Sequence, residues 1–177
     1  MIRQVITKTY IPRPASAVSN YLIDLYGHTL KQAKLQKLLY LCHGWNLAIY
    51  DKPLIIEPFI AKEFGPLLEC IHFEYHLLGN GLITHPILFF DDDCRTSKYT
   101  LDQSDKCIPL IERVIDIYGE FTYPELFSVV YNDLAYQKIK KDQSDGILIP
   151  NSLIKESFIH KIKNSKLILA GEKENAL

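Results

Sequence analysis

The sequence reads KLQKLLYLCHGWNLA from Lys34 to Ala48, and this stretch predicts the centre of the fold. Its apolar side chains recur every three or four residues, a spacing that places them on one face of a helix. That face comprises Leu35, Leu38, Leu39, Cys42, Trp45 and Ile49, and it is widened by Leu41 and Ala48. We therefore expect a helix from about Lys31 to Tyr50 whose apolar face forms the middle of the core.

The same helix carries polar residues. Lys31, Lys34 and Lys37 crowd its first turns, where positive charge opposes the helix dipole. This arrangement favours contact with an acidic partner. Asn46 falls inside the apolar arc, and a buried amide must find hydrogen-bond partners. It either binds a nearby loop carbonyl or forms a polar spot in a groove for a partner.

Periodicity predicts further helices on both sides of this one. They are expected over residues 15–26, 108–118, 122–132 and 134–141, and from 152 onward. Thr122 and Glu125 form a capping-box pattern that opens the third of them. A shorter helix is expected from Pro66 to Leu78.

Short extended elements are expected between the helices. Residues 58–64 are expected to be extended and to be closed by a turn at Gly65-Pro66. Residues 83–90 and 98–101 are expected to form two short strands around the acidic loop 91–93. The sequence therefore predicts a mainly α fold, a compact helical domain with a small β-hairpin or short β element.

The composition is that of one ordinary globular domain. The chain has 177 residues, 47% hydrophobic and 23% charged, which excludes a disordered or disulfide-stapled protein. We divide it into an extended N-terminal arm (1–14), one helical domain (15–164) and a partly flexible C-terminal tail (165–177). The longest apolar run has five residues, whereas a membrane-spanning helix needs about 20. No export signal is visible, so we expect a cytoplasmic protein that does not bind membranes.

Charge is distributed unevenly along the chain. Residues 1–37 carry six basic and one acidic side chain, residues 38–132 six basic and fourteen acidic, and residues 133–166 seven basic and four acidic. The net charge of −1 argues against a dedicated nucleic-acid binder, which is usually strongly basic. A chain with basic ends and an acidic middle can present charged faces, and such faces steer its association with a protein partner.

Candidate catalytic and metal-binding residues are few. His72 and His76 lie four apart with Glu74 between them, but the zinc-protease order H-E-x-x-H is absent. The acidic loop 91–93 lacks the alternate ligand spacing of a calcium loop. Neither G-x-S-x-G nor a glycine-rich phosphate loop occurs. We expect no catalytic residue, no metal and no cofactor; a metal-dependent enzyme that uses the two histidines is one alternative.

A family resemblance rests on the first stretch and three segments after it, Lys52-Pro-Leu, Glu57-Pro-Phe-Ile-Ala61 and Phe64-Gly-Pro66. The pattern K-L-Q-K-L-L-Y-x-x-x-G-W, K-P-L, E-P-x-x-A and Y/F-G-P resembles the Panacea antitoxin domain of SocA-like and phage-associated GepA-like proteins. The resemblance covers about residues 15–162. It is weaker in the second half, where Tyr131-Asn-Asp-Leu-Ala-Tyr136 stands in place of the His and Trp that the family often shows.

The resemblance implies a mainly α-helical antitoxin, not an enzyme, that neutralises a cognate toxin encoded nearby by direct protein contact. An ATP-dependent protease is a second implied partner, for the case in which the antitoxin is a proteolytic adaptor. A DNA-binding autorepressor is the alternative, supported by the basic ends and opposed by the acidic middle. Structural motif residues are expected at Leu35, Leu38, Gly44, Trp45, Ala61, Phe64, Gly65 and Pro66. Partner-binding residues, which also suit intramolecular bonds, are expected at Lys34, Gln36, Lys37, Asn46 and Glu57.

Overall fold

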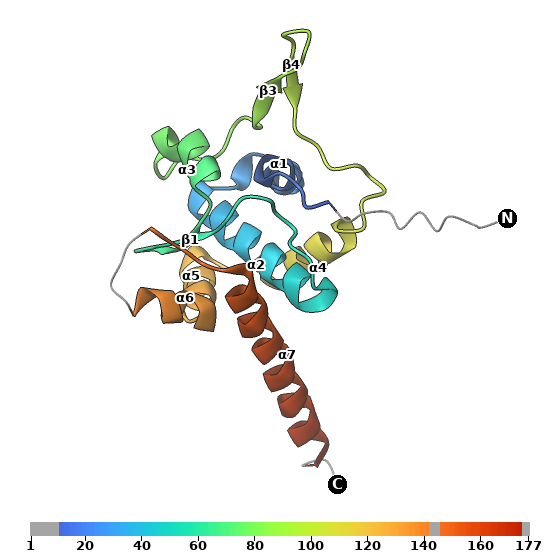
Figure 1. The fold of residues 1–177 in the computed structure, drawn as a ribbon, viewed down its shortest axis with the longest axis vertical. Coiled ribbons are helices and arrows are strands. Elements are labelled where there is room, and N and C mark those ends of the chain that lie inside the picture. The colour runs from blue at the N-terminus through green and yellow to red at the C-terminus, as the bar shows by residue number, and fades with distance from the viewer. Residues whose placement is uncertain (1–10, 142–145, 175–177) are drawn as a thin grey trace, which may run out of the picture.

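A computed structural model describes residues 11–141 and 146–174 (Figure 1). In this part of the chain the fold is mainly α-helical with small β elements, as predicted. The helices are α1 (Ala15–Tyr26), α2 (Gln32–Tyr50), α3 (Glu69–Tyr75), α4 (Ile108–Tyr118), α5 (Tyr123–Tyr131), α6 (Leu134–Lys140) and α7 (Asn151–Glu174), with 3-10 turns at Gly27–Thr29 and His76–Leu78. The strands are β1 (Ile60–Lys62), β2 (Gly65–Leu67), β3 (Leu88–Phe90), β4 (Thr96–Lys98) and β5 (Ile147–Leu148).

Helix α2 is buried on almost every side, which corrects the expectation of one buried face. Helices α1, α3, α4, α5 and α7 and strand β2 all pack against it (Figure 1). Every side chain from Leu35 to Cys42 is buried, whereas Ile49, which periodicity placed on the inner face, is 51% exposed. Periodicity identifies an inward face only where the other side of a helix meets water. Because α2 has neighbours on most sides, most of its polar residues also lie in the interior.

Strands β1, β2 and β5 form a small antiparallel sheet in the order β2-β1-β5. Ala61 pairs with Pro66 across the first hairpin, so the turn lies at residues 63–64. The prediction of a turn at Gly65-Pro66 is therefore wrong, because both residues belong to β2. Helix α3 accordingly starts at Glu69 rather than at Pro66.

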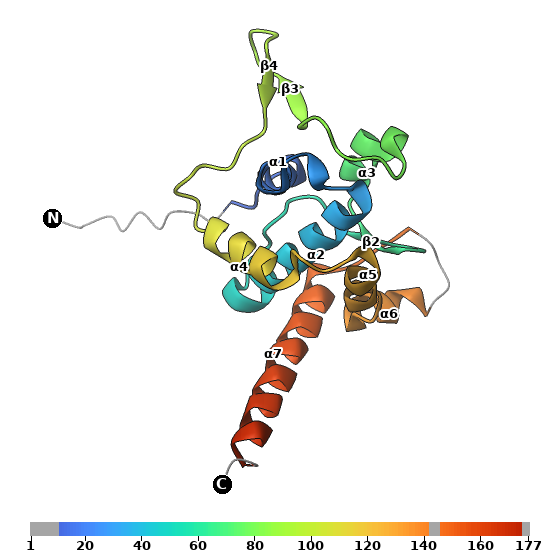
Figure 2. The same ribbon diagram turned by 180° about the vertical axis from the view of Figure 1, so that it is seen from behind.

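The second hairpin, β3–β4, projects from the molecule at the end opposite α7 (Figure 1 and Figure 2). Two strands around the acidic loop are confirmed, although both are shorter than expected and the second begins at Thr96. The Asp91 carboxylate closes the tip by accepting the N–H groups of Asp93 (3.0 Å) and Arg95 (2.8 Å). At the base, the buried Asn20 side chain exchanges two 2.8 Å hydrogen bonds with the Ile87 backbone.

Helix α7 crosses α2 at Gly44. A Cβ atom added to Gly44 would lie 2.2 Å from Cε2 of Phe158, far inside any real contact distance. The Phe158 ring therefore lies directly on the α2 backbone, and it packs edge-on against Trp45 with centroids 5.2 Å apart. Glycine in this motif serves close helix approach. Beyond the crossing, α7 leaves the body of the molecule (Figure 2).

Several helix boundaries follow the sequence closely. Helix α1 spans the predicted residues and ends at Gly27, whose φ is +56°. The capping box of α5 is formed, with the Glu125 carboxylate accepting the Thr122 N–H at 2.7 Å. Helix α7 continues to Glu174, past the domain limit set at 164. Of the predicted N-terminal arm, residues 1–10 lie outside the described residues, and Arg13 forms a bridge with Ile55.

None of the helices within the described ranges combines the length and the apolar character needed to cross a membrane.

Candidate functional site: a groove beside the motif helix

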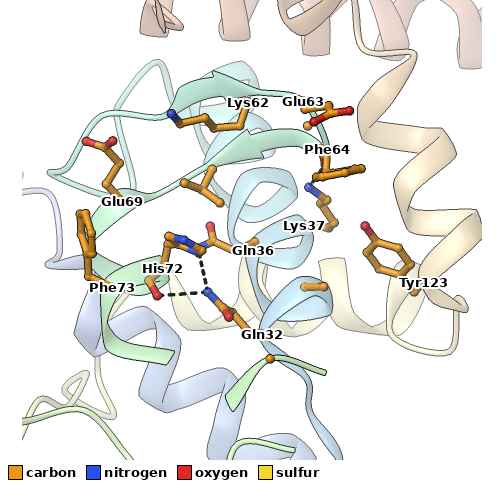
Figure 3. Close-up of a pocket in the computed structure, with 14 residues that line it drawn as sticks. Gln32, Gln36, Lys37, Lys62, Glu63, Phe64, Glu69, His72, Phe73 and Tyr123 are labelled. Carbon is orange, nitrogen blue, oxygen red and sulfur yellow. Dashed lines mark hydrogen bonds between the residues drawn. The ribbon is translucent and has the colours of Figure 1, made fainter. Parts of the chain in front are cut away.

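A groove of about 550 Å³ lies beside the first turns of α2 (Figure 3). The β1–β2 hairpin, α3 and the start of α5 form its other walls. Among its lining residues are Gln32, Gln36, Lys37, Lys62, Glu63, Phe64, Gly65, Glu69, His72, Phe73 and Tyr123. The fold thus brings together two predicted partner-binding residues, Gln36 and Lys37, and two motif residues, Phe64 and Gly65.

Gln36 joins two walls of the groove. Its Oε1 accepts the N–H of Leu68 at 2.9 Å, and its Nε2 donates to the Leu68 carbonyl at 3.0 Å. The side chain is 2% exposed, so these two bonds meet the need of a buried amide. They attach α2 to the segment between β2 and α3. Gln36 is therefore a structural clamp at the edge of the groove.

Lys37 lies in the floor of the groove, and its ammonium group donates to the carbonyl of Phe64 in the hairpin turn. The residue is only 4% exposed, and burial lowers the pKa of its amine to about 8. A Cβ atom added to Gly65 would lie 2.8 Å from the Lys37 Nζ, so glycine at this position leaves room for the ammonium group. The lysine and the glycine of the motif thus fit each other.

The rim of the groove is aromatic and exposed. Phe64 is 63% exposed, Phe73 67% and Tyr123 40%. Figure 3 shows the Lys37 amine beside Phe64, with Tyr123 on the other side of the lysine. Two acidic side chains, Glu63 and Glu69, are exposed at the same rim. The groove therefore combines a buried cationic donor with apolar walls.

Of the two histidines considered for a metal site, His72 lines the groove and His76 follows at the end of α3. The His72 Nδ1 is 2.9 Å from Nε2 of Gln32, which also donates to the His72 carbonyl at 3.2 Å. The His76 Nδ1 contacts the Phe73 carbonyl at 2.7 Å, and the two rings are 6.2 Å apart between centroids. No cluster of three or more potential metal ligands occurs within the described part of the chain.

The other three predicted partner-binding residues lie outside this groove. Lys34 donates to the Gly119 carbonyl at 2.6 Å and lines a neighbouring hollow of about 430 Å³. Asn46 is buried and donates to the Lys52 carbonyl at 2.6 Å, the intramolecular option considered for it. Glu57 accepts the first N–H of α1, from Ala15, at 2.8 Å. Lys34 thus fastens α2 to the end of α4, Asn46 fastens α2 to the segment that follows it, and Glu57 fastens that segment to α1.

Two buried polar groups were not identified from the sequence as structural centres. Asp133 is fully buried and receives hydrogen bonds from Tyr40 (2.8 Å), Ser157 (2.7 Å) and Lys161 (2.6 Å). Its position directly before α6, where it also caps the Ala135 N–H at 3.1 Å, is the local signal that could have indicated it. The bonds from α2 and α7 are not visible in any local pattern.

His43 is the second of these groups. Its Nδ1 accepts the N–H of Ile55 at 3.2 Å, and its Nε2 lies 3.0 Å from Oδ1 of Asn151 at the start of α7. Burial lowers the pKa of His43 to about 4, so the ring is neutral at pH 7 and donates through Nε2. Although it adjoins Cys42, both side chains are buried, and burial raises the pKa of the Cys42 thiol. Neither has the exposure and thiolate character of a catalytic pair.

The groove offers a donor and apolar surface, as a protein-binding site does. In comparisons with known proteins, the family model described as antitoxin SocA-like, Panacea domain, matches residues 35–135. No curated protein and no solved structure gave a significant match. The matched region includes most of α2, the β1–β2 hairpin, α3 and α5, and hence most of the groove. Because the match covers more than half of the chain, the protein belongs to the SocA-like antitoxin family with a Panacea domain.

Proposed function

We propose that this protein is the antitoxin of a toxin–antitoxin pair and neutralises a toxin protein encoded nearby by binding it directly. The observation that carries the proposal is the family match over residues 35–135, which contains the Lys37 groove and its exposed rim residues Phe64, Phe73 and Tyr123. Exposed aromatic side chains around a polar centre are typical anchors of protein interfaces. We take this groove as the toxin-binding surface.

Co-expression with the product of the adjacent gene tests the proposal. The neighbouring product alone is expected to stop growth, and the wild-type protein is expected to restore it. If the neighbour is harmless, or if it stays toxic in the presence of this protein, the proposed function is wrong.

A pair of variants locates the surface. The double variant Phe64→Ala/Phe73→Ala removes two exposed rings from the rim. It should reduce the number of cells that survive toxin expression at least about tenfold, since interface aromatic residues often contribute more than 1 kcal/mol each to binding. Phe90→Ala removes a ring that is 77% exposed on the distant β3–β4 hairpin, and it should rescue like wild type. Equal rescue by all three proteins would place toxin binding elsewhere.

Neutralisation has two modes, blocking and delivery to an ATP-dependent protease. Following the toxin level after arrest of protein synthesis separates the two modes. A blocked toxin stays at constant level beside the antitoxin. A toxin delivered by an adaptor disappears, and only in cells that contain the protease.

A further inference from the structure

We propose that the groove binds a single carboxylate side chain of the partner protein, flanked by apolar residues, with the Lys37 ammonium group as its anchor. The identity of the partner as a toxin rests on the proposed function, whereas the chemistry of the groove rests on the residues that line it. The occupant is thus a segment of the partner in which one Asp or Glu is set between large apolar side chains.

Lys37 has hydrogen-bonding capacity that the fold leaves open. An ammonium group has three donors, and in the part of the chain that the structure describes the Phe64 carbonyl is the one acceptor that contacts the Lys37 ammonium group. Within residues 11–141 and 146–174, no carboxylate lies within 4.0 Å of its Nζ. Burying a cation without a counter-ion is costly, and a carboxylate brought into the groove would relieve that cost. Charge-assisted hydrogen bonds of this kind are stronger than neutral ones.

The remaining charges around the groove define how acidic the occupant is. The titratable groups that line the groove together with Lys37, from the hairpin, α3 and α5, are Lys62, Glu63, Glu69, His72 and Tyr123. Lys37 lies deep, whereas Glu63 and Glu69 are exposed at the rim. A tract of several acidic residues would therefore meet repulsion at the entrance. A single carboxylate can reach Lys37 in the floor, while the apolar residues on either side of it pack against Phe64 and Phe73 at the rim.

The inference can be tested without the toxin. The probes are two blocked pentapeptides, Gly-Phe-Glu-Phe-Gly and the same peptide with Gln in place of Glu, and their binding is followed by NMR shifts of the Phe64 and Gly65 amides. We expect wild-type protein to bind the Glu peptide about tenfold more tightly than the Gln peptide. Equal affinities, or no binding of either peptide, would overturn the inference.

Three variants separate the anchor from the rim. Lys37→Met should abolish the preference for Glu over Gln, and Phe64→Ala should weaken both peptides while leaving the preference. Lys106→Met removes an exposed lysine near the other end of α2 and should change nothing. A Glu preference that survives in Lys37→Met contradicts the assignment of the anchor. Because the Lys37 bond to Phe64 also supports the hairpin turn, Phe64→Ala gives a test in which that lysine is kept.

The pH dependence provides a readout that a purely structural lysine would not affect. In the protein without a bound peptide the Lys37 amine has a pKa of about 8, and a bound carboxylate favours the charged form of this amine. The affinity for the Glu peptide should therefore fall above pH 8, by about tenfold in total because the charged contact accounts for a tenfold preference, while the affinity for the Gln peptide changes less. Parallel pH profiles for the two peptides would count against the anchor.

The growth of cells that express the toxin then tests whether the groove chemistry serves the proposed function. Lys37→Met should fail to neutralise a toxin that wild-type and Lys106→Met proteins neutralise, and full rescue by Lys37→Met would overturn the anchor. If wild-type protein neutralises no neighbouring product, the proposed function fails, and the peptide experiment still decides whether the groove binds a carboxylate.

Discussion

Two buried ionic groups in this domain are treated in opposite ways. The Asp133 carboxylate at the α6 end is surrounded by donors from three helices, including Lys161 at 2.6 Å. The Lys37 ammonium group at the hairpin end has one carbonyl acceptor and an open groove in front of it. Both residues are under 5% exposed. A satisfied buried charge fastens helices together, whereas an incompletely satisfied one beside a cavity retains capacity for a ligand.

The contrast assigns different roles to the two ends of the family motif helix. Toward α7, Tyr40, His43 and Gly44 are committed to intramolecular packing and hydrogen bonds. Toward the hairpin, Gln36 fixes the wall and Lys37 faces the groove. Mutations in the first set should act on stability, and mutations at Lys37 should act mainly on binding.

The largest expected effect is on the satisfied charge. Asp133→Ala leaves Tyr40, Ser157 and Lys161 without their shared acceptor and should lower the free energy of unfolding by about 4 kcal/mol, because removing one member of a buried ion pair typically costs 3–5. Urea unfolding followed by circular dichroism measures the change. Asp133→Asn, which keeps a carbonyl oxygen at the same place, should lose less. A loss under 1 kcal/mol in the alanine variant would show that Asp133 does not hold α6 and α7 to α2.

The next effect concerns the helix crossing. Gly44→Ala places a methyl group where the Phe158 ring now lies, so α7 must shift, and we expect a loss of about 3 kcal/mol from overpacking. Gly27→Ala is the matched control, since nothing lies within 4 Å of its added Cβ and only its positive φ is strained. It should cost about 1 kcal/mol. Equal losses in the two variants would contradict the close contact at Gly44.

Local signals were sufficient for much of this fold. The ends of α1 and the start of α5 follow from apolar spacing, Gly27 and the Thr122 capping box, all of which act within a few residues. The turn at residues 63–64 was misplaced because Gly65-Pro66 is a frequent turn pair, whereas here Pro66 pairs with Ala61 in the sheet. The pairing of β1 with β5 joins residues far apart in sequence, and no local pattern encodes it.

The candidate site shows the same limit more sharply. The family motif selected Gln36 and Lys37, which do line one groove, but it also selected Glu57, which lies elsewhere. Asn46, selected from its place in the apolar arc, likewise lies outside the groove in an intramolecular hydrogen bond. A polar residue in an apolar arc signals burial with a partner, and only the tertiary fold decides whether that partner belongs to the same chain. Phe73 and Tyr123 at the rim could not be selected, because an exposed aromatic residue has no periodic signature.

The smallest expected effect is the change with pH in the contribution of Lys37 to the free energy of unfolding. The Lys37 amine has a pKa of about 8 in the folded protein against an ordinary value of 10.5, so between these values the folded state binds fewer protons than the unfolded chain. Stability contributed by this residue must then rise with pH in that interval. From pH 7 to pH 9 the free energy of unfolding of wild type, relative to Lys37→Met, should increase by about 1 kcal/mol.

Urea unfolding of both proteins at pH 7, 8 and 9 measures this difference. The buried thiols and tyrosines titrate in both proteins and cancel, and Lys106→Met makes the same change at an exposed position. The difference in the free energy of unfolding between Lys106→Met and Lys37→Met therefore reports the effect of burying the Lys37 amine. If that gap stays constant across the range, the ammonium group is better solvated or paired than its place in the groove floor implies, and the contrast with Asp133 disappears. If it grows with pH, Lys37 pays a desolvation cost in the free protein that a partner's carboxylate can relieve.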